Sequence, residues 1–167
     1  MVSDAITRES AADQVWDLLD HVMDPEIPVI SVVDLGIVRD VRQGADGLEV
    51  VITPTYSGCP ATRQIEQDIC AALARAGIDA KLSVVLSPAW TTDWISQAGR
   101  QKLEGYGIAP PAGKAGKRAM FGAEPQVACP RCGSVQTEMI SEFGSTPCKA
   151  LWRCGECREP FDYFKCI

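Results

Sequence analysis

Two pairs of cysteines near the C-terminal end constrain the fold of this 167-residue chain more than any other feature. Cys129 and Cys132 form one C-x-x-C pair, and Cys154 and Cys157 form a second pair after 21 intervening residues. Because four thiolates at this spacing can complete a tetrahedral metal site, the sequence predicts a zinc ribbon over residues 127–167. About forty residues bury too little apolar surface to fold unaided, so we expect the metal to supply much of this module's stability.

The predicted metal site is structural, because four protein ligands leave no open position for a substrate. Zinc is favoured over iron, although a tetrahedral four-sulfur site accepts both metals. Cys148 and Cys166 remain outside the tetrad. Either could replace a cysteine of the C-x-x-C pairs, but their isolated positions favour packing residues or spare thiols. We expect short strands of the ribbon at residues 136–142 and 161–165.

A single cysteine marks the stretch TPTYSGCP at residues 53–60. An alternating, strand-like segment precedes it, and a helix with a buried stripe is expected after it, at Ile65, Ile69, Ala72, Leu73 and Ala76. Pro60 suits the first turn of that helix, where a missing N–H costs nothing. Cys59 would then lie at the positive end of the helix, where exposed amides and the macrodipole favour a thiolate. A thiolate is the form of cysteine that binds metals and acts as a nucleophile.

The other patterns in residues 1–104 predict a small α+β domain, with helices packed on a three- or four-stranded mixed sheet. Ser10 with Asp13 makes a capping-box pattern, so a first helix is expected to begin at Ser10. Residues 37–42 and 48–53 have the pattern of a hairpin.

A third strand is expected at residues 81–86, and a last helix from Thr91 or Thr92 to about Leu103. Cys70 lies next to the apolar stripe and is expected to be a small core residue. His21 is the only histidine, so a structural or solvent-facing role is favoured for it.

The composition changes after residue 104. Residues 105–126 are rich in Gly, Pro, Ala and Lys without an apolar period, which predicts a flexible linker. Residues 1–104 hold 8 Lys and Arg against 16 Asp and Glu, a net charge of −8. Because a nucleic-acid binder normally has a basic face, this balance argues against DNA or RNA as the main partner.

The chain has no apolar run near the roughly 20 residues that cross a bilayer, so we expect a cytoplasmic protein without a membrane partner. In that compartment its eight cysteines are expected to be metal ligands or reactive thiols rather than disulfides. The sequence shows no Ser/His/Asp constellation, phosphate loop or dinucleotide fingerprint.

Several of these residues resemble a known family. Three motifs resemble the SufT-type domain of iron–sulfur cluster assembly proteins. They are the DPE at residues 24–26, the DLGIV at residues 34–38, and Thr53 with the GCP at residues 58–60. The whole chain, with its ending FGSTPCKALWRCGECREPFDYFKCI, resembles the PaaD (or PaaJ) family. These are the small subunits encoded with the ring 1,2-phenylacetyl-CoA epoxidase of aerobic phenylacetate degradation. The resemblance runs essentially from end to end.

The resemblance implies an accessory or maturation protein of the epoxidase system, which assists iron–sulfur cluster or iron assembly in the reductase or the oxygenase. The di-iron site, the flavin and the [2Fe–2S] cluster of that system belong to those partners. This chain has no paired Glu-x-x-His motifs and no flavin or NAD site, so we do not expect it to be catalytic alone.

In this interpretation Cys59 binds a cluster or iron transiently, and Asp34 and Thr53 shape the pocket. One thiolate cannot hold a cluster that takes four ligands, so a homodimer or small-molecule thiols would complete the shell. The alternative is a non-catalytic structural or adaptor subunit of the epoxidase complex, in which Cys59 is merely packed. A nucleic-acid-binding ribbon is a weaker third hypothesis, because the acidic balance disfavours it.

Overall fold

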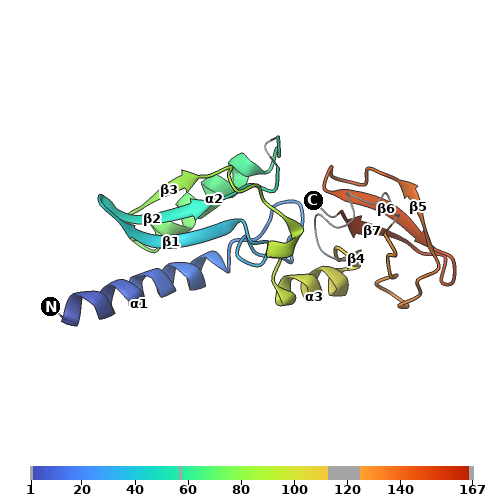
Figure 1. The fold of residues 1–167 in the computed structure, drawn as a ribbon, viewed down its shortest axis with the longest axis horizontal. Helices are drawn as coiled ribbons and strands as arrows, with labels where there is room; N and C mark the ends of the chain where they lie inside the picture. Colours follow the sequence, from blue (N-terminus) through green and yellow to red (C-terminus); the bar gives the residue numbers. More distant parts are fainter. Residues whose placement is uncertain (1, 57, 113–124, 166–167) are drawn as a thin grey trace. The chain divides into compact units, whose positions relative to one another are not determined.

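The computed structural model of the chain describes residues 2–56, 58–112 and 125–165. It divides into two compact units, Met1–Trp90 and Thr91–Ile167, which are described separately (Figure 1). Within the described residues, no helix combines the length and the apolar character needed to cross a membrane.

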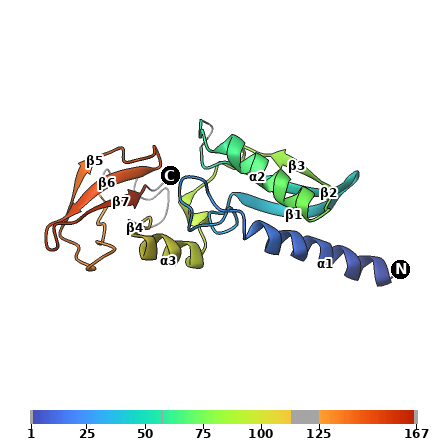
Figure 2. The same ribbon diagram turned by 180° about the vertical axis from the view of Figure 1, so that it is seen from behind.

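The first unit contains a three-stranded sheet and two helices, which are α1 (Val2–Leu19), β1 (Val38–Gly44), β2 (Gly47–Ile52), α2 (Thr62–Arg75) and β3 (Ala80–Val84). The strand order is β1-β2-β3. β1 pairs antiparallel with β2, and β2 pairs parallel with β3, so the predicted hairpin and the predicted mixed sheet are confirmed. The helical connection from β2 to β3 is α2, which lies along the strands (Figure 2).

The pattern of apolar residues explains how these elements pack. α2 buries Ile65, Ile69, Ala72 and Leu73, as their helical spacing predicts. β2 ends in a run of three buried residues, Val50, Val51 and Ile52, as expected of a central strand covered on both sides. α1 contacts both α2 and β1, and α2 contacts β3. The carboxyl end of β2 therefore leads from the middle of this unit into the loop that carries Cys59.

Three expectations about the helices were wrong. α1 begins at Val2, so Ser10 lies inside the helix and does not cap it; no Pro or Gly among residues 2–9 stops the helix from starting earlier. α2 begins at Thr62 after the N-cap Ala61, so Pro60 lies in the preceding turn. Cys70 is exposed, because it follows the buried Ile69 and so lies about 100° farther around the helix.

A long loop between α1 and β1 forms part of the core of the first unit. Its Ile27, Ile30 and Leu35 are almost fully buried. The indole Nε1–H of Trp90 donates to the carbonyl oxygen of Leu35 at 2.9 Å, which ties this loop to the segment after β3. The chain at Asp24 is also anchored, because its N–H donates to the carbonyl oxygen of Ile30 at 2.9 Å. This loop provides one wall of the site described below.

The second unit consists of a 3-10 turn, a helix and four strands, which are η1 (Thr92–Trp94), α3 (Gln97–Tyr106), β4 (Ile108–Ala109), β5 (Thr137–Ser141), β6 (Lys149–Cys154) and β7 (Pro160–Phe164). The strand order is β4-β7-β6-β5, with β4 parallel to β7 and the other pairs antiparallel. Its core gathers small and aromatic residues, namely Ala109, Val127, Cys129, Ala150, Trp152, Cys154, Phe161 and Tyr163. The predicted α+β domain followed by a β module is confirmed.

The segment before the ribbon differs from the sequence-based expectation. α3 begins after Ser96, whose Oγ accepts the N–H of Gly99 at 2.8 Å, and the threonines expected to cap it lie at η1 instead. β4 falls in the predicted linker 105–126 and pairs with β7, and the N–H of Ala112 donates to the hydroxyl of Tyr163 at 3.3 Å. Residues 105–112 thus belong to the ribbon unit, and residues 113–124 lie outside the described residues.

Candidate functional site

The four cysteines of the predicted tetrad meet at one point of the second unit. The sulfur atoms of Cys129, Cys132, Cys154 and Cys157 all lie within 4.8 Å of one another. The Cys129–Cys157 sulfur distance is 3.7 Å and the Cys132–Cys154 distance is 3.5 Å. A tetrahedron with Zn–S bonds of about 2.3 Å has edges of about 3.8 Å, so the spacing suits a tetrahedral metal ion. Over the described part of the chain, no other group of three or more His, Cys, Asp or Glu side chains converges in this way.

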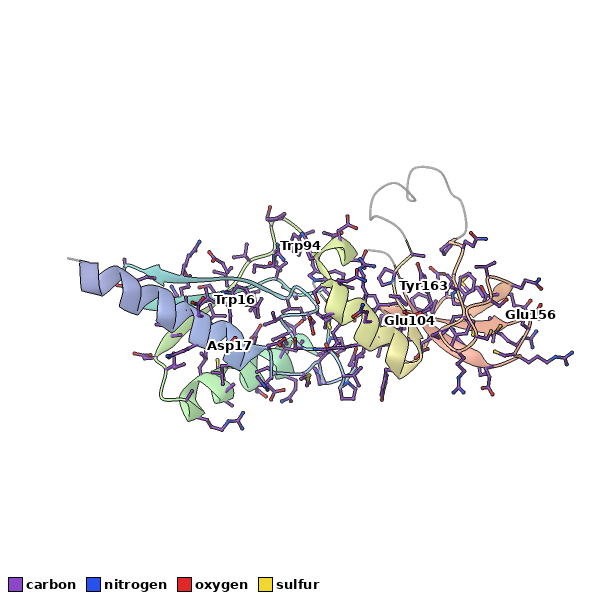
Figure 3. All side chains as sticks on the ribbon, turned by 90° about the horizontal axis from the view of Figure 1, so that it is seen from below. Trp16, Asp17, Trp94, Glu104, Glu156 and Tyr163 are labelled. Atoms are coloured by element: carbon purple, nitrogen blue, oxygen red, sulfur yellow. The ribbon has the colours of Figure 1, made fainter. Side chains whose placement is uncertain are left out.

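The two C-x-x-C turns have matching backbones. The residue after the second cysteine is left-handed in both turns, with φ of 75° at Gly133 and 61° at Arg158. Glycine adopts this conformation freely, whereas arginine does so at a steric cost. Figure 3 shows the second turn, marked by Glu156, at the end of this unit away from the helix that carries Glu104.

The thiols of the tetrad differ in their electrostatic surroundings. The backbone N–H of Cys157, followed by that of Glu156, favours the Cys154 thiolate and lowers the pKa of Cys154 to about 7. The backbone N–H of Glu159 likewise favours the Cys157 thiolate, but desolvation and the neighbouring thiols of the tetrad outweigh it and raise the pKa of Cys157 to about 12. Four thiolates in contact need a cation to balance their charge. The cluster is therefore built for a metal ion.

A second site lies in the first unit, where a small pocket forms beside Cys59. Its polar lining comes from Asp24, Thr55, Cys59 and Thr62. The remaining walls are apolar and consist of Ile37, Ile52, Pro54 and Ile65. The loop before β1, the end of β2, the loop after β2 and the start of α2 all contribute, so residues far apart in the sequence surround one half-buried thiol.

Short turns hold Cys59 at the pocket. Its N–H donates to the carbonyl oxygen of Tyr56, and its own carbonyl oxygen accepts the N–H of Thr62, both at 3.2 Å. The N-cap residue of α2 is Ala61, which offers no side-chain acceptor, and the first turn of α2 has no acidic residue. The positive end of the α2 dipole is therefore left without a neutralising side chain from its own first turn.

Asp24 is the polar neighbour of Cys59 that sequence reasoning did not single out as a site residue. Its side chain is nearly buried, and its Oδ1 accepts the N–H groups of Glu26 and Ile27, each at 2.8 Å. The DPE motif contained this signal, because an aspartate before a proline commonly caps a turn. Only the fold shows that Asp24 and Cys59 line the same pocket.

Asp34 and Thr53, the two other residues predicted for the pocket, are close in sequence to wall residues but are not among the residues that line the pocket. Asp34 is buried, and its N–H donates to the Oγ of Ser31 at 3.0 Å. Thr53 is also buried, and its N–H donates to the carbonyl oxygen of Ile37 at 2.8 Å. Their geometry supports the loops that carry the pocket walls, and a direct role for either side chain remains a prediction.

Cys148 and His21 are not among the residues that form either site. Cys148 is buried outside the tetrad, with its sulfur 3.0 Å from the Oγ1 of Thr146. Cys166 falls outside the described residues. His21 is exposed and its Nδ1 lies 2.8 Å from the carbonyl oxygen of Asp17, in agreement with the solvent-facing role expected for it.

Two family models match the chain, one over each unit's characteristic part. An "Iron-sulfur cluster assembly protein" model matches residues 12–84, which include the Cys59 pocket. A "PaaD zinc beta ribbon domain" model matches residues 113–165, which include the cysteine tetrad.

The relatives match either nearly the whole chain or about half of it. The chain is 52% identical over 155 residues to a protein of Escherichia coli that is named as one subunit of a "Putative 1,2-phenylacetyl-CoA epoxidase", covering 92% of each chain. It is 35% identical to the Bacillus subtilis "Fe-S protein maturation auxiliary factor YitW", over 54% of this chain and 90% of the relative. A crystal structure of a "Domain of Unknown Function DUF59" from Bacillus anthracis resembles 59% of this chain and 96% of its own, with a TM-score of 0.55 at 27% identity. The similarity to the maturation factor covers about half of this chain.

Proposed function

Because the chain belongs to the PaaD family, we propose that it is an accessory maturation protein of the phenylacetyl-CoA epoxidase system. In this role it assists iron–sulfur cluster or iron assembly in the reductase or the oxygenase, in the cytoplasm. The observation that carries the proposal is the combination of an iron–sulfur assembly domain and a PaaD ribbon in one chain. The chain's own contribution is binding and release of cargo rather than catalysis.

Cys59 is the residue proposed to contact the cargo. Its thiol is half-buried in a pocket with apolar walls, and it lies just before the first turn of α2. A single thiolate suits a labile ligand, because a stable iron–sulfur cluster commonly takes four cysteines. A second copy of the chain or small-molecule thiols would supply the remaining ligands. Asp34 and Thr53 would support the pocket from behind its walls.

The ribbon is proposed to recognise the client protein, with zinc as the structural ion of its tetrad. Zinc suits the tetrad because it accepts four thiolates in a closed tetrahedral site. The metal would hold the two C-x-x-C turns together and so stabilise the surface offered to the reductase or oxygenase. Its role there is architectural, since all four positions are filled by protein ligands.

Anaerobic reconstitution with iron and sulfide tests the role of Cys59. The wild-type protein should gain a cluster or bound iron, and Cys59→Ser should gain much less. Cys70→Ser is the matched control, because Cys70 is an exposed cysteine on α2 and lies outside the pocket. Equal iron content in wild type and Cys59→Ser would rule out this assignment.

A structural adaptor of the epoxidase complex is the second candidate, favoured by the word "subunit" in the name of the Escherichia coli relative. In that role Cys59 is a packing residue and the acidic first unit bridges other subunits. The metal content of oxygenase and reductase from cells lacking this protein separates the two functions. Depleted clusters or iron support maturation, whereas fully loaded partners that fail to work together support the adaptor.

A further inference from the structure

The exposed apolar side chains of the ribbon lie in one short stretch. In residues 125–165, every large apolar side chain that is exposed lies in β5 or beside it, and these residues are Val135, Met139, Ile140 and Phe143. β5 is an edge strand of its sheet and pairs only with β6 (Figure 1). Single exposed apolar residues are common on soluble proteins, whereas a group of them marks a binding surface. Met139, Ile140 and Phe143 are called the β5 patch below.

A β-bulge determines how β5 presents Met139 and Ile140. The register of β5 against β6 shifts between Met139 and Ser141, so Ile140 has no residue opposite it. Consecutive residues of a regular strand point to opposite faces, whereas a bulge re-aims side chains. Met139 is 48% exposed and Ile140 is 52% exposed. Because a bulge also hinders the addition of another strand, β5 offers its side chains rather than its backbone to a partner.

Phe143 follows β5 and is held in place, although 62% of it is exposed. Its N–H donates to the Oγ of Ser141 at 3.3 Å, and its carbonyl oxygen accepts the Ser141 hydroxyl at 2.9 Å. The Lys165 ammonium lies 4.4 Å from the centroid of the Phe143 ring, which is a cation–π contact. An aromatic side chain that is already ordered loses little conformational entropy on binding. Phe143 therefore has the properties of an anchor residue in a protein interface.

Lys165 adds a positive charge beside the β5 patch. Its Nζ donates to the carbonyl oxygen of Glu142 at 3.1 Å, and an ammonium group has further donors to offer. Among the described residues, no carboxylate forms an ion pair with Lys165. A carboxylate of a partner would complement this charge. A second copy of the chain is disfavoured, because a two-fold contact centred on Phe143 brings one Lys165 against the other.

We propose that the β5 patch is the surface by which the ribbon docks on its client protein. The client offers an apolar pocket for Phe143 and a carboxylate that faces Lys165, while Met139 and Ile140 exclude water around this anchor. The inference rests on the proposed recognition of a client by the ribbon, and it names the surface and the chemistry of the partner. Cys59 belongs to the first unit, so docking and cargo binding can be separated by mutation.

Biolayer interferometry of the full-length, zinc-loaded protein against the purified reductase and the purified oxygenase tests the role of Phe143. Phe143→Ala should weaken binding to the client ~30-fold, the effect of removing an interface anchor. Leu86→Ala and Tyr106→Ala are the matched controls, because they also remove exposed apolar side chains and lie outside the β5 patch. Both controls should bind like wild type, and zinc content should be the same in all variants.

Variants of Lys165 test the charge of the client. Lys165→Met keeps an apolar side chain near the Phe143 ring and removes the ammonium, so binding should weaken by up to ~5-fold, as for an exposed ion pair. Lys165→Arg should bind like wild type, because a guanidinium keeps the charge and the cation–π contact. Glu142→Gln removes a neighbouring negative charge and should not weaken binding. Weaker binding of Glu142→Gln together with unchanged binding of Lys165→Met would overturn the acidic client.

The outcomes separate this inference from the proposed function. Equal affinity of wild type and Phe143→Ala for both clients overturns the docking surface. If wild type binds neither client but the partners in cells still depend on Cys59 for their iron, the docking surface is wrong and the maturation role stands. Loss of binding in Phe143→Ala, with fully loaded partners in Cys59→Ser cells, supports the docking surface and refutes maturation. A wild-type dimer in sedimentation that Phe143→Ala abolishes, with unchanged client binding, assigns the patch to a second copy and overturns the inference.

Discussion

Replacing one ligand of the tetrad, Cys154→Ser, should release the metal and unfold the ribbon while leaving the first unit folded. Cys154 is fully buried at the end of β6, and its sulfur lies 3.5 Å from the sulfur of Cys132, so it is an interior member of the tetrad. The two units are compact in themselves, and the loss of the ribbon therefore should not spread to residues before Trp90.

The size of the effect follows from the number of ligands. Structural zinc sites of this type contribute about 10–16 kcal/mol of apparent binding free energy. An equal share for each of four ligands is about 2.5–4 kcal/mol, which corresponds to ~10²–10³-fold weaker binding. The ribbon core is small, so a loss of this size exceeds what its apolar contacts can offset.

The assay is zinc content after dialysis against a competing chelator, combined with amide NMR spectra of wild type and variant. Cys148→Ser is the matched control, because Cys148 is also a buried cysteine of the ribbon but lies outside the tetrad. Cys154→Ser should lose zinc and the dispersed ribbon signals, and Cys148→Ser should keep both. Unchanged zinc in Cys154→Ser would refute the tetrad.

Three further predictions concern local features of the second unit. Gly133→Ala should destabilise the ribbon by about 1–2 kcal/mol, because φ is 75° at this position and alanine adopts this conformation at a steric cost. Arg158→Gly should stabilise the ribbon by roughly 0.5–1 kcal/mol, because φ is 61° there. Thermal unfolding of the zinc-loaded protein measures both changes, and equal shifts of the melting temperature in one direction would contradict the role of backbone strain. Ser96→Ala should cost about 1 kcal/mol, since it removes the acceptor of the Gly99 N–H; an unchanged melting temperature would argue against the cap. Zinc binding should release protons from the thiols, so competition titrations should show a zinc affinity that falls as the pH falls. The fall should be steeper below pH about 7, because the pKa of Cys154 is about 7 and this thiol also takes up a proton there. A zinc affinity independent of pH would contradict thiolate ligation.

The sequence predicted those elements that are defined by the spacing of residues along the chain. The C-x-x-C pairs identified the tetrad, and the period of Ile65 and Ile69 identified the buried face of α2. The hairpin of β1 and β2 followed from alternation around a glycine turn, and its register brings Gly44 opposite Gly47. In each case the spacing along the chain already determines which side chains lie together.

The features that the sequence did not predict depend mostly on contacts between segments that are distant in the chain. The two-residue strand β4 is too short for any periodicity, and only its pairing with Asp162 and Tyr163 of β7 defines it. Asp24 lies 35 positions before Cys59, so the fold of the loop before β1 is needed to place both at one pocket. The exposure of Cys70 could have been predicted, because its neighbour Ile69 already occupies the centre of the buried stripe.

The proposed function is the maturation of an epoxidase partner through Cys59. The most direct measurement is the iron and sulfide content of the reductase and oxygenase purified from cells whose only copy of this protein carries Cys59→Ser, beside Cys70→Ser cells. We expect partners depleted of cluster or iron with Cys59→Ser and fully loaded partners with Cys70→Ser. Fully loaded partners in both strains, at equal levels of the two variants, would contradict it.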